Sequence, residues 1–259
     1  MNKQQKILLA VTAISTFNAV PAVAQGSDDN QPSNDDYVSV GIGAISIESP
    51  FSGESARVLP LPILSIKQGA FYFEGAETGL KLDTSVSGLT PSVQAFVAAR
   101  NTVARDRQKF TADAGARLTL GSKLGDLSAE YRHDITGTFD GGEVILRYQL
   151  PINLGRFTIS PAAQVNFLDQ ATANHMYGVT AKQRARAIRK GRDVILPIAP
   201  ITDSATNFGT DLTATYRISD KLTLIGVFAN TYLDKAIRRS PAIDRKCESQ
   251  AIVGLTYSF

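Results

Sequence analysis

The stretch Glu248–Phe259, "ESQAIVGLTYSF", decides the fold. From Ala251 to Phe259 every second residue is apolar, and small or hydroxyl-bearing residues lie between them. A period of two places these sets on opposite faces of a β-strand. Chain ends usually fray into solvent unless something ties them down. The stretch therefore predicts a strand that is paired within a sheet.

The same alternation recurs from Tyr37 onward in segments of about 9–12 residues, longer than the ~5–6 residues of an average strand. Strands of this length cross a bilayer when they are tilted. Ten strands are predicted, near residues 37–47, 58–67, 70–85, 111–120, 126–135, 142–150, 156–167, 206–217, 221–232 and 248–259. Twelve strands are the alternative, if 70–85 breaks between Gly75 and Gly79 and if 168–205 contains another strand.

The two faces of these strands differ in a way that favours a membrane barrel over a soluble sandwich. The polar faces carry charges of both signs, which a water-contacting lumen tolerates. The charged residues are Lys81, Asp83, Asp113, Arg117, Glu130, Arg132, Arg147, Asp211 and Arg217. The apolar faces often end in aromatic residues, as an interfacial girdle does. The predicted fold is therefore all-β, an antiparallel transmembrane β-barrel, with lumen charges that pair across the barrel.

Segment lengths between the predicted strands alternate, as they do in outer-membrane barrels. Long segments fall at 48–57, 86–110, 168–205 and 233–247, and short turns lie between them. An even strand count places both termini on the periplasmic side. Pro60 and Pro62 interrupt the second predicted strand and indicate a bulge or a locally unpaired stretch, because proline donates no ladder hydrogen bond.

The first residues follow a different pattern. Residues 1–24 combine two early lysines, a short apolar run and an A-x-A site, which predicts a secretory signal peptide cleaved after Ala24. Residues 25–36 are acidic and rich in helix breakers, so a flexible periplasmic leader is expected there. The barrel then occupies 37–259. This organisation predicts export to the bacterial outer membrane, with membrane lipid around the barrel.

Composition and motifs give little sign of catalysis. The 259 residues carry a formal net charge of +3, and no nucleic-acid motif is present. The histidine His133 lies beside Asp134, but the alternation places it on the opposite face from Ser128, so a Ser/His/acid set is disfavoured. No spacing of histidine, cysteine and acidic residues suggests a metal site. We expect neither an enzyme nor a cofactor.

One basic stretch falls in the predicted outer segment 168–205. It contains Lys182, Arg184, Arg186, Arg189, Lys190 and Arg192. Arginine forks match the geometry of phosphate oxygens, so this stretch could contact lipopolysaccharide. A solvated polar loop or short helix is the alternative.

Several segments resemble the MipA/OmpV family of outer-membrane proteins. They are "VGIGAISIESPFSGESARVLPLPILSIKQGAFYFEGAETGLKL", "YGVTAKQ", "YRISDKLTLIGVFANTYLDKAIRRSP" and the terminal "GLTYSF". The resemblance covers residues 37–259 and implies an outer-membrane barrel. The last strand also resembles the signal by which such barrels are recognised for assembly, with Phe259, Tyr257 and Leu255 as its residues.

The resemblance also implies a function. The family's named member acts as a scaffold that joins a lytic transglycosylase to a peptidoglycan synthase, so we expect a non-enzymatic scaffold for cell-wall enzymes. Other members are described as porin-like, adhesive or antibiotic-responsive. The alternative is therefore a narrow transport barrel or a surface adhesin that uses the long outer loops.

Overall fold

The computed structural model describes residues 36–100 and 111–259. The predicted signal peptide, its cleavage after Ala24 and nearly all of the predicted leader lie outside the described residues. The described strands are β1 (Tyr37–Glu48), β2 (Arg57–Gln68), β3 (Phe71–Glu74), β4 (Glu77–Asp83), β5 (Thr90–Arg100), β6 (Thr111–Ser122), β7 (Gly125–Asp134), β8 (Gly142–Gln149), β9 (Ile152–Leu154), β10 (Phe157–Leu168), β11 (Ala205–Arg217), β12 (Leu222–Tyr232) and β13 (Cys247–Ser258).

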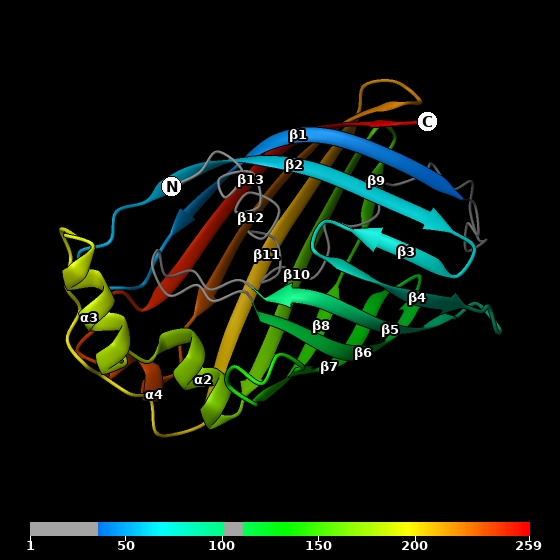
Figure 1. The fold of residues 1–259 in the computed structure, drawn as a ribbon. Coiled ribbons are helices and arrows are strands. Elements are labelled where there is room, and N and C mark those ends of the chain that lie inside the picture. Colours follow the sequence, from blue (N-terminus) through cyan, green and yellow to red (C-terminus); the bar gives the residue numbers. More distant parts are fainter. Residues whose placement is uncertain (1–35, 101–110) are drawn as a thin grey trace.

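The described strands form one closed antiparallel barrel (Figure 1). Their order is β11-β12-β13-β1-β2-β3-β4-β5-β6-β7-β8-β10, and pairing of β11 with β10 closes the ring. The short strand β9 pairs with the first residues of β10, Phe157–Ile159, and β8 pairs with the later residues Ala162–Leu168. The ring therefore has twelve strands and one extra strand. Closure satisfies backbone groups that an open edge would leave unpaired in lipid.

The strand count of twelve corrects two details of the sequence prediction. Segment 70–85 breaks into β3 and β4 as the twelve-strand alternative expects, and Gly75 makes the turn with a φ of 59° that glycine adopts without a Cβ clash. The other added strand is β5, inside the segment 86–110 that was predicted as a long loop. Segment 168–205 holds two helices and no further strand.

The two ends of the barrel differ, as the alternation of loop lengths predicts. Both described chain ends and the short turns lie at one end, which we call the terminal end. The long segments at the other, loop-bearing end hold helices α2 (Gln170–Tyr177), α3 (Ala181–Arg189) and α4 (Lys235–Arg238). Among the described residues, no helix has the length and hydropathy needed to cross a membrane.

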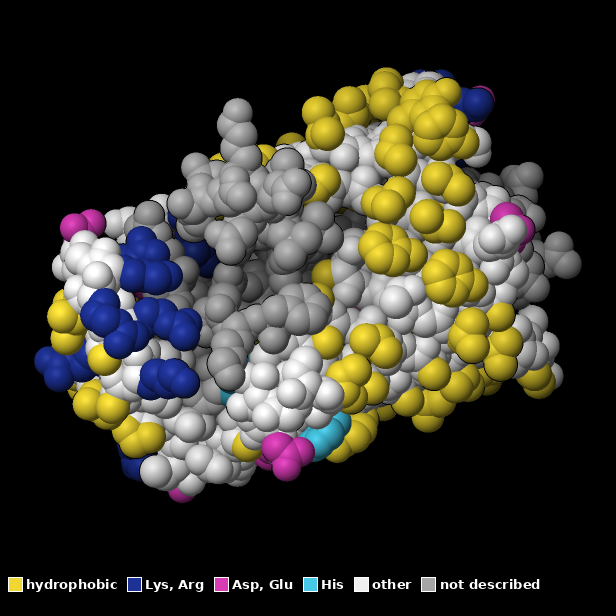
Figure 2. Space-filling model, viewed as in Figure 1, with side chains coloured by type: hydrophobic (Ala, Val, Ile, Leu, Met, Phe, Trp, Pro, Cys, Tyr) yellow, Lys and Arg dark blue, Asp and Glu magenta, His cyan; other side chains and the backbone are white. Residues whose placement is uncertain are grey.

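The wall follows the predicted alternation. Figure 2 shows hydrophobic side chains spread over the outside of the strands. Exposed apolar side chains on β13 are Val253, Leu255 and Tyr257, whereas the intervening Ile252 and Thr256 are buried. Charged side chains on β5 to β8 face inward and are buried. An apolar exterior around a charged interior inverts the arrangement of a soluble protein and suits a barrel surrounded by lipid.

The terminal strand β13 is paired on both edges, with β12 and with β1. Beyond it, the backbone N–H of Phe259 donates to the carbonyl of Val38 over 3.0 Å. The rings of Tyr257 and Phe259 meet edge to face with centroids 5.2 Å apart. The prediction that the chain end is tied into a sheet is confirmed. The assembly-signal role of Phe259, Tyr257 and Leu255 stays a prediction.

A packed apolar cap covers the loop-bearing end. Its buried members include Phe51 from the β1–β2 loop, Tyr177 from α2 and Ile237 from α4. Backbone hydrogen bonds join the loops, such as Ser52 N–H to the carbonyl of Ala242 over 2.9 Å. These loops therefore form a fixed surface, which positions α2 over the barrel interior.

Candidate functional site

A ladder of buried charges runs along the inside of the barrel from β4 to β8. Arg117 bridges Glu77 (3.0 Å) and Glu130 (2.6 Å), and Glu130 also pairs with Arg132. Arg132 lies 3.8 Å from Glu143. Sequence-distant acids and bases meet because antiparallel register places inward residues of neighbouring strands side by side.

The ladder continues to the loop-bearing end. The Nε of Arg100 donates to Asp113 over 2.6 Å, and its Nη1 donates to Glu143 over 2.8 Å. All three side chains are buried. A second group pairs Arg147 with both oxygens of Asp211, at 2.5 and 2.9 Å. The lumen charges do pair, but the prediction that they pair across the barrel is wrong. The pairs run along the wall, between strands that lie next to or near one another, because strand register places inward residues of such strands within reach.

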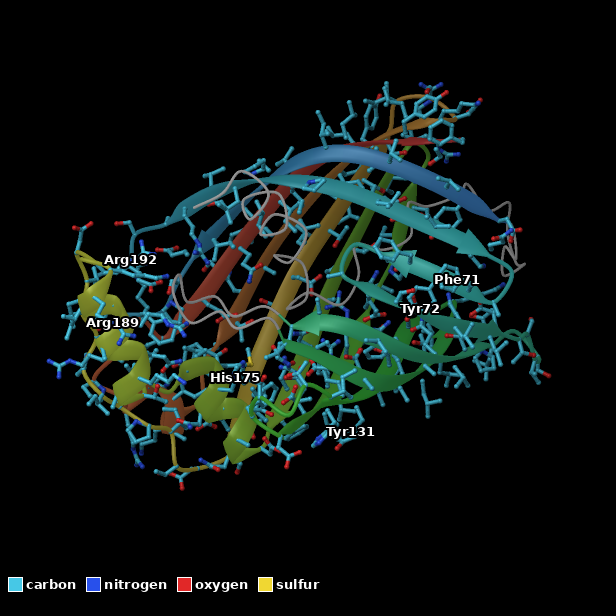
Figure 3. The ribbon with its side chains drawn as sticks, in the orientation of Figure 1. Phe71, Tyr72, Tyr131, His175, Arg189 and Arg192 are labelled. Carbon is cyan, nitrogen blue, oxygen red and sulfur yellow. The ribbon has the colours of Figure 1, made fainter. Side chains whose placement is uncertain are left out.

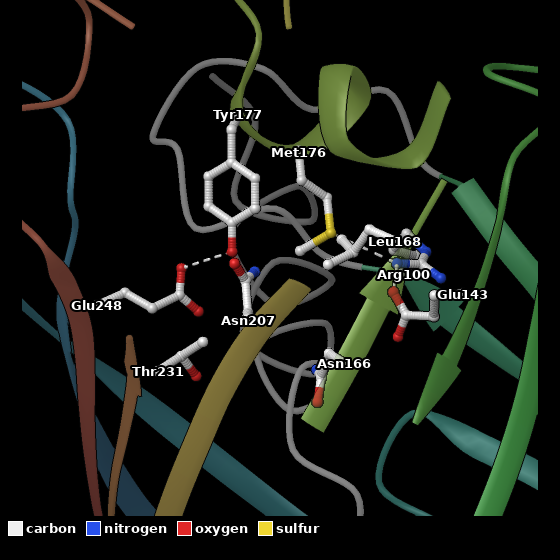
Figure 4. Close-up of a pocket in the computed structure, with 9 residues that line it drawn as sticks. All are labelled: Arg100, Glu143, Asn166, Leu168, Met176, Tyr177, Asn207, Thr231 and Glu248. Carbon is white, nitrogen blue, oxygen red and sulfur yellow. Dashed lines mark hydrogen bonds and ion pairs between the residues drawn. The ribbon is translucent and has the colours of Figure 1, made fainter. Parts of the chain in front are cut away.

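A small polar pocket lies where the ladder meets α2 (Figure 4). Its lining residues are Arg100, Glu143, Asn166, Leu168, Met176, Tyr177, Asn207, Thr231 and Glu248. Met176 and Tyr177 point down from the last turn of α2 into the barrel. The Sδ of Met176 accepts from Arg100 over 3.6 Å, and the hydroxyl of Tyr177 donates to Glu248 over 3.3 Å. Helix α2 thereby closes the interior from the loop-bearing end.

The phenol of Tyr177 is fixed in its protonated form. Burial and the nearby carboxylates of Glu248 and Glu143 raise the pKa of Tyr177 well above its ordinary value. A neutral hydroxyl is a hydrogen-bond donor, so it holds Glu248 in place. The pocket therefore combines charged, amide and hydroxyl groups that are largely paired with one another, as in a structural core.

Asp169 anchors α2 over the interior. Its carboxylate accepts from the backbone N–H of Thr172 and of Gly142, both over 2.7 Å, so it caps the helix and ties it to β8. Burial works against ionisation, but these backbone hydrogen bonds lower the pKa of Asp169 below its ordinary value. The ionised carboxylate therefore stabilises the seating of α2.

We expect the seating of α2 to weaken in acid. A carboxyl group with a lowered folded-state pKa stabilises the fold fully above its unfolded pKa of about 3.9, and this contribution is lost as pH falls through the folded value. Protection of the α2 amides, measured as the intrinsic exchange rate divided by the observed rate at the same pH, should therefore decrease below about pH 4. Asp169→Ala should cost about 0.5–2 kcal/mol of local stability at neutral pH. Asp169→Asn is the control: pH dependence of α2 exchange equal to that of the unmodified chain would contradict the assignment.

The basic stretch is mostly helical, as the short-helix alternative expects. Lys182, Arg184, Arg186 and Arg189 lie on α3, and Lys190 caps its end. Thr180 begins the helix with a capping box to Gln183. Figure 3 shows Arg189 and Arg192 at the loop-bearing end, away from the strands. We call the six basic residues from Lys182 to Arg192 the basic segment.

The histidine considered in the sequence is placed as the alternation predicts. Nε2 of His133 lies 3.3 Å from Asp140 in the following turn. Asp134 accepts hydrogen bonds from Thr136, Thr138 and the backbone of the same turn. These two residues therefore order the β7–β8 turn. Over residues 36–100 and 111–259, no group of three metal-ligating side chains comes together.

Sequence reasoning missed the residues that organise the pocket. Arg100 fell inside a predicted loop, and Glu248 and Tyr177 lie 71 positions apart in the chain. The available signal was the alternation in "TPSVQAFVAAR", which places Gln94, Phe96 and Arg100 on one face. The pairing of Glu248 with Tyr177 has no sequence signal, because it depends on how α2 sits on the barrel.

The chain is similar to known outer-membrane proteins. Putative outer membrane protein YiaT of Escherichia coli (strain K12) is 25% identical over 236 residues, covering 86% of this chain and 91% of that protein. The MltA-interacting protein of the same strain is 22% identical over 262 residues, and the match covers 97% of this chain and 98% of that protein. Outer-membrane expressed OmpT of Vibrio cholerae superposes with a TM-score of 0.44 and 7% identity, covering 87% of this chain and 97% of that one.

The family comparison covers nearly the whole barrel. The family described as MltA-interacting protein MipA matches residues 40–259, from the middle of β1 to the final Phe259. The matched region contains every strand of the ring, the charged ladder and the three helices of the loop-bearing end. This chain belongs to the MltA-interacting protein (MipA) family of outer-membrane proteins.

Proposed function

We propose that this barrel is a non-enzymatic, membrane-embedded binding partner for a peptidoglycan lytic transglycosylase, and that a peptidoglycan synthase joins the same assembly. Membership of the MltA-interacting protein family carries the proposal. The paired charges of the interior support a binding role over passive diffusion, because they line the wall as ion pairs and not as free charges that face a water-filled channel.

The terminal end is the surface proposed for docking, on the premise that it faces the periplasm. Two neighbouring turns extend there, residues 150–156 and 218–221, and Arg217 N–H donates to the carbonyl of Arg156 over 2.8 Å. The second turn lies beside the C-terminus in Figure 1. The exposed apolar side chains of this pair are Ile152, Leu154 and Ile218. Exposed apolar groups held by backbone pairing are typical of protein-binding surfaces.

The test is capture of a purified lytic transglycosylase of the MltA type by the full chain in lipid nanodiscs. Leu154→Asp should weaken the measured dissociation constant by about tenfold or more, since a central apolar contact contributes more than ~1.4 kcal/mol. Leu124→Asp is the matched control, because Leu124 is an exposed leucine in another turn at the same end, 79% exposed against 59% for Leu154.

The outcomes separate the parts of the proposal. No capture by the unmodified chain would overturn the binding role. If Leu154→Asp and Leu124→Asp weaken capture equally, the docking surface lies elsewhere on the terminal end. The predicted leader, residues 25–36, is then the next segment to delete.

A further inference from the structure

The barrel wall is incomplete beside β2. Strand β3 pairs with β2 only over Ser65–Gln68, and the β3–β4 hairpin turns back at Gly75. Within the described residues, positions 57–64 of β2 have a sheet partner on the β1 side alone. Three strand spacings, about 14 Å, separate β2 from β5 across the hairpin. We call the region beyond the hairpin the wall gap; β2 runs past β3 in Figure 1.

The edge of β2 along the wall gap has an unusual chemistry. The carbonyl of Leu64 accepts from Gly75 N–H over 3.0 Å, so it points toward β3. Backbone direction alternates along a strand, so Pro62 and Pro60 turn their carbonyls the same way. Proline has no N–H. At Pro60 and Pro62 this edge therefore offers carbonyl acceptors and no N–H donor, which prevents the regular pairing of an added strand at these two positions.

The rest of the wall gap is apolar. Val58, Pro60 and Pro62 face outward and are exposed. Leu61 and Ile63 face inward and belong to a buried apolar cluster with neighbours on β1, β12 and β13. In hydrocarbon, an unpaired carbonyl is costly unless a donor reaches it. A ligand that suits this edge brings an apolar chain and hydrogen-bond donors.

The basic segment lies next to the same edge. A Cβ placed on Gly53, in the loop that leads into β2, would meet the side chain of Val194 at 3.3 Å, so the chain packs beside that loop two residues after the basic segment ends. Figure 2 shows the Lys and Arg side chains gathered at this end. Among the described residues, no carboxylate lies within 4.0 Å of the charged groups of Lys182, Arg184 or Arg189. Such cations bind phosphate.

We propose that the wall gap and the basic segment together bind an anionic glycolipid with amide-linked, hydroxylated acyl chains, the chemistry of the lipid A part of lipopolysaccharide. Its phosphate binds the basic segment. One acyl chain lies along the exposed edge of β2. The amide or hydroxyl group near the head of that chain donates to the carbonyls of Pro60 and Pro62. The site is at the opposite end of the barrel from the proposed transglycosylase surface, so the two proposals can fail separately.

Photo-crosslinking tests the position of the site. Benzoylphenylalanine replaces either Val58, beside the wall gap, or Phe208, which is also outward and exposed near the loop-bearing end but lies on the fully paired strand β11. Each full chain is inserted into phosphatidylcholine vesicles that contain a few per cent of lipid A. Crosslinking to lipid A should be about fivefold greater at 58 than at 208, as ~1 kcal/mol of preference gives. Equal crosslinking at the two positions would overturn the site.

Two further arms test the chemistry. Replacing Lys182, Arg184 and Arg189 together by glutamine should lower crosslinking at 58 by about fivefold, to the level at 208, because these surface cations supply the attraction toward an anionic lipid. Phosphatidylglycerol, whose acyl chains carry no donors, should compete poorly. Undiminished crosslinking in the glutamine variant, or displacement of lipid A by an equal amount of phosphatidylglycerol, would overturn the assignment. Heat-modifiable gel mobility confirms folding, and position 64, on the same outward face of β2, replaces 58 if that variant fails to fold.

Discussion

Replacing Arg100 by methionine is expected to lower the free energy of unfolding by about 3–5 kcal/mol, because it leaves buried carboxylates without their partner. Arg100 is buried and pairs with Asp113 at 2.6 Å and Glu143 at 2.8 Å. Both acids keep their positions on β6 and β8 in the variant. Urea unfolding of the barrel in phospholipid vesicles, followed by heat-modifiable gel mobility, measures the change.

Arg245→Met is the matched control. Arg245 pairs with Glu48 at 2.6 Å, as short a contact as that of Arg100, but the two side chains are 39% and 48% exposed. Exposed pairs contribute only ~0–1 kcal/mol because water screens both charges. Adding Asp113→Asn and Glu143→Gln to Arg100→Met should recover part of the loss. If Arg100→Met alone is no less stable than Arg245→Met, the prediction is wrong. That result would mean that water reaches the charges of the ladder and solvates the unpaired carboxylates.

The architecture could be predicted from the sequence because each strand of a lipid-facing barrel alternates between an apolar outer face and a polar inner face. The period of two in β1, β6, β7 and β13 identifies two faces, and loop parity places both ends of the chain together. The sequence does not predict β5 because the strand follows Gly88, contains Pro91 and is rich in alanine, so its apolar positions give a weak signal. The length of the predicted loop 86–110 is itself a signal, because loops that long usually contain secondary structure of their own or have a function.

The partners of the charged residues inside the barrel could not be predicted from the sequence, for a different reason. Period two shows that Arg117, Glu130 and Arg147 face the lumen, but which acid meets which base depends on strand register. Register follows from turn lengths that the sequence sets only approximately. The placement of Met176 and Tyr177 depends in turn on α2, which begins at Gln170. The sequence predicts a helix in this segment only as an alternative for the basic stretch further along, and none over 170–177. Long-range contacts therefore decided the site.

The same dependence explains the two prolines. Pro60 and Pro62 indicate a bulge or an unpaired stretch, and the second interpretation is confirmed on one edge only. β2 pairs with β1 through both positions, and the ends of the ring stay closed. A proline signal in a strand thus identifies an interrupted ladder but not the edge on which the interruption falls.

Val253→Arg is expected to cost about 2–4 kcal/mol of barrel stability in a bilayer, the cost of an arginine on the lipid face near the midplane. Val253 lies halfway along β13, pairs with Ala44 and Gly226, and is 61% exposed. Leu127→Arg is the control: Leu127 is 55% exposed, on the same outer face, at the terminal end of β7. Near the interface the same substitution should cost only ~0–1 kcal/mol.

The comparison tests what surrounds the barrel. Val253 and Leu127 are both aliphatic and similarly exposed, and the difference that the comparison uses is their depth along the wall. Water treats both positions alike, whereas hydrocarbon penalises the deeper charge because its solvation decreases toward the midplane. Unfolding in phospholipid vesicles measures both costs. Equal costs for Val253→Arg and Leu127→Arg would mean that water or protein, and not a bilayer, covers the apolar side of β13.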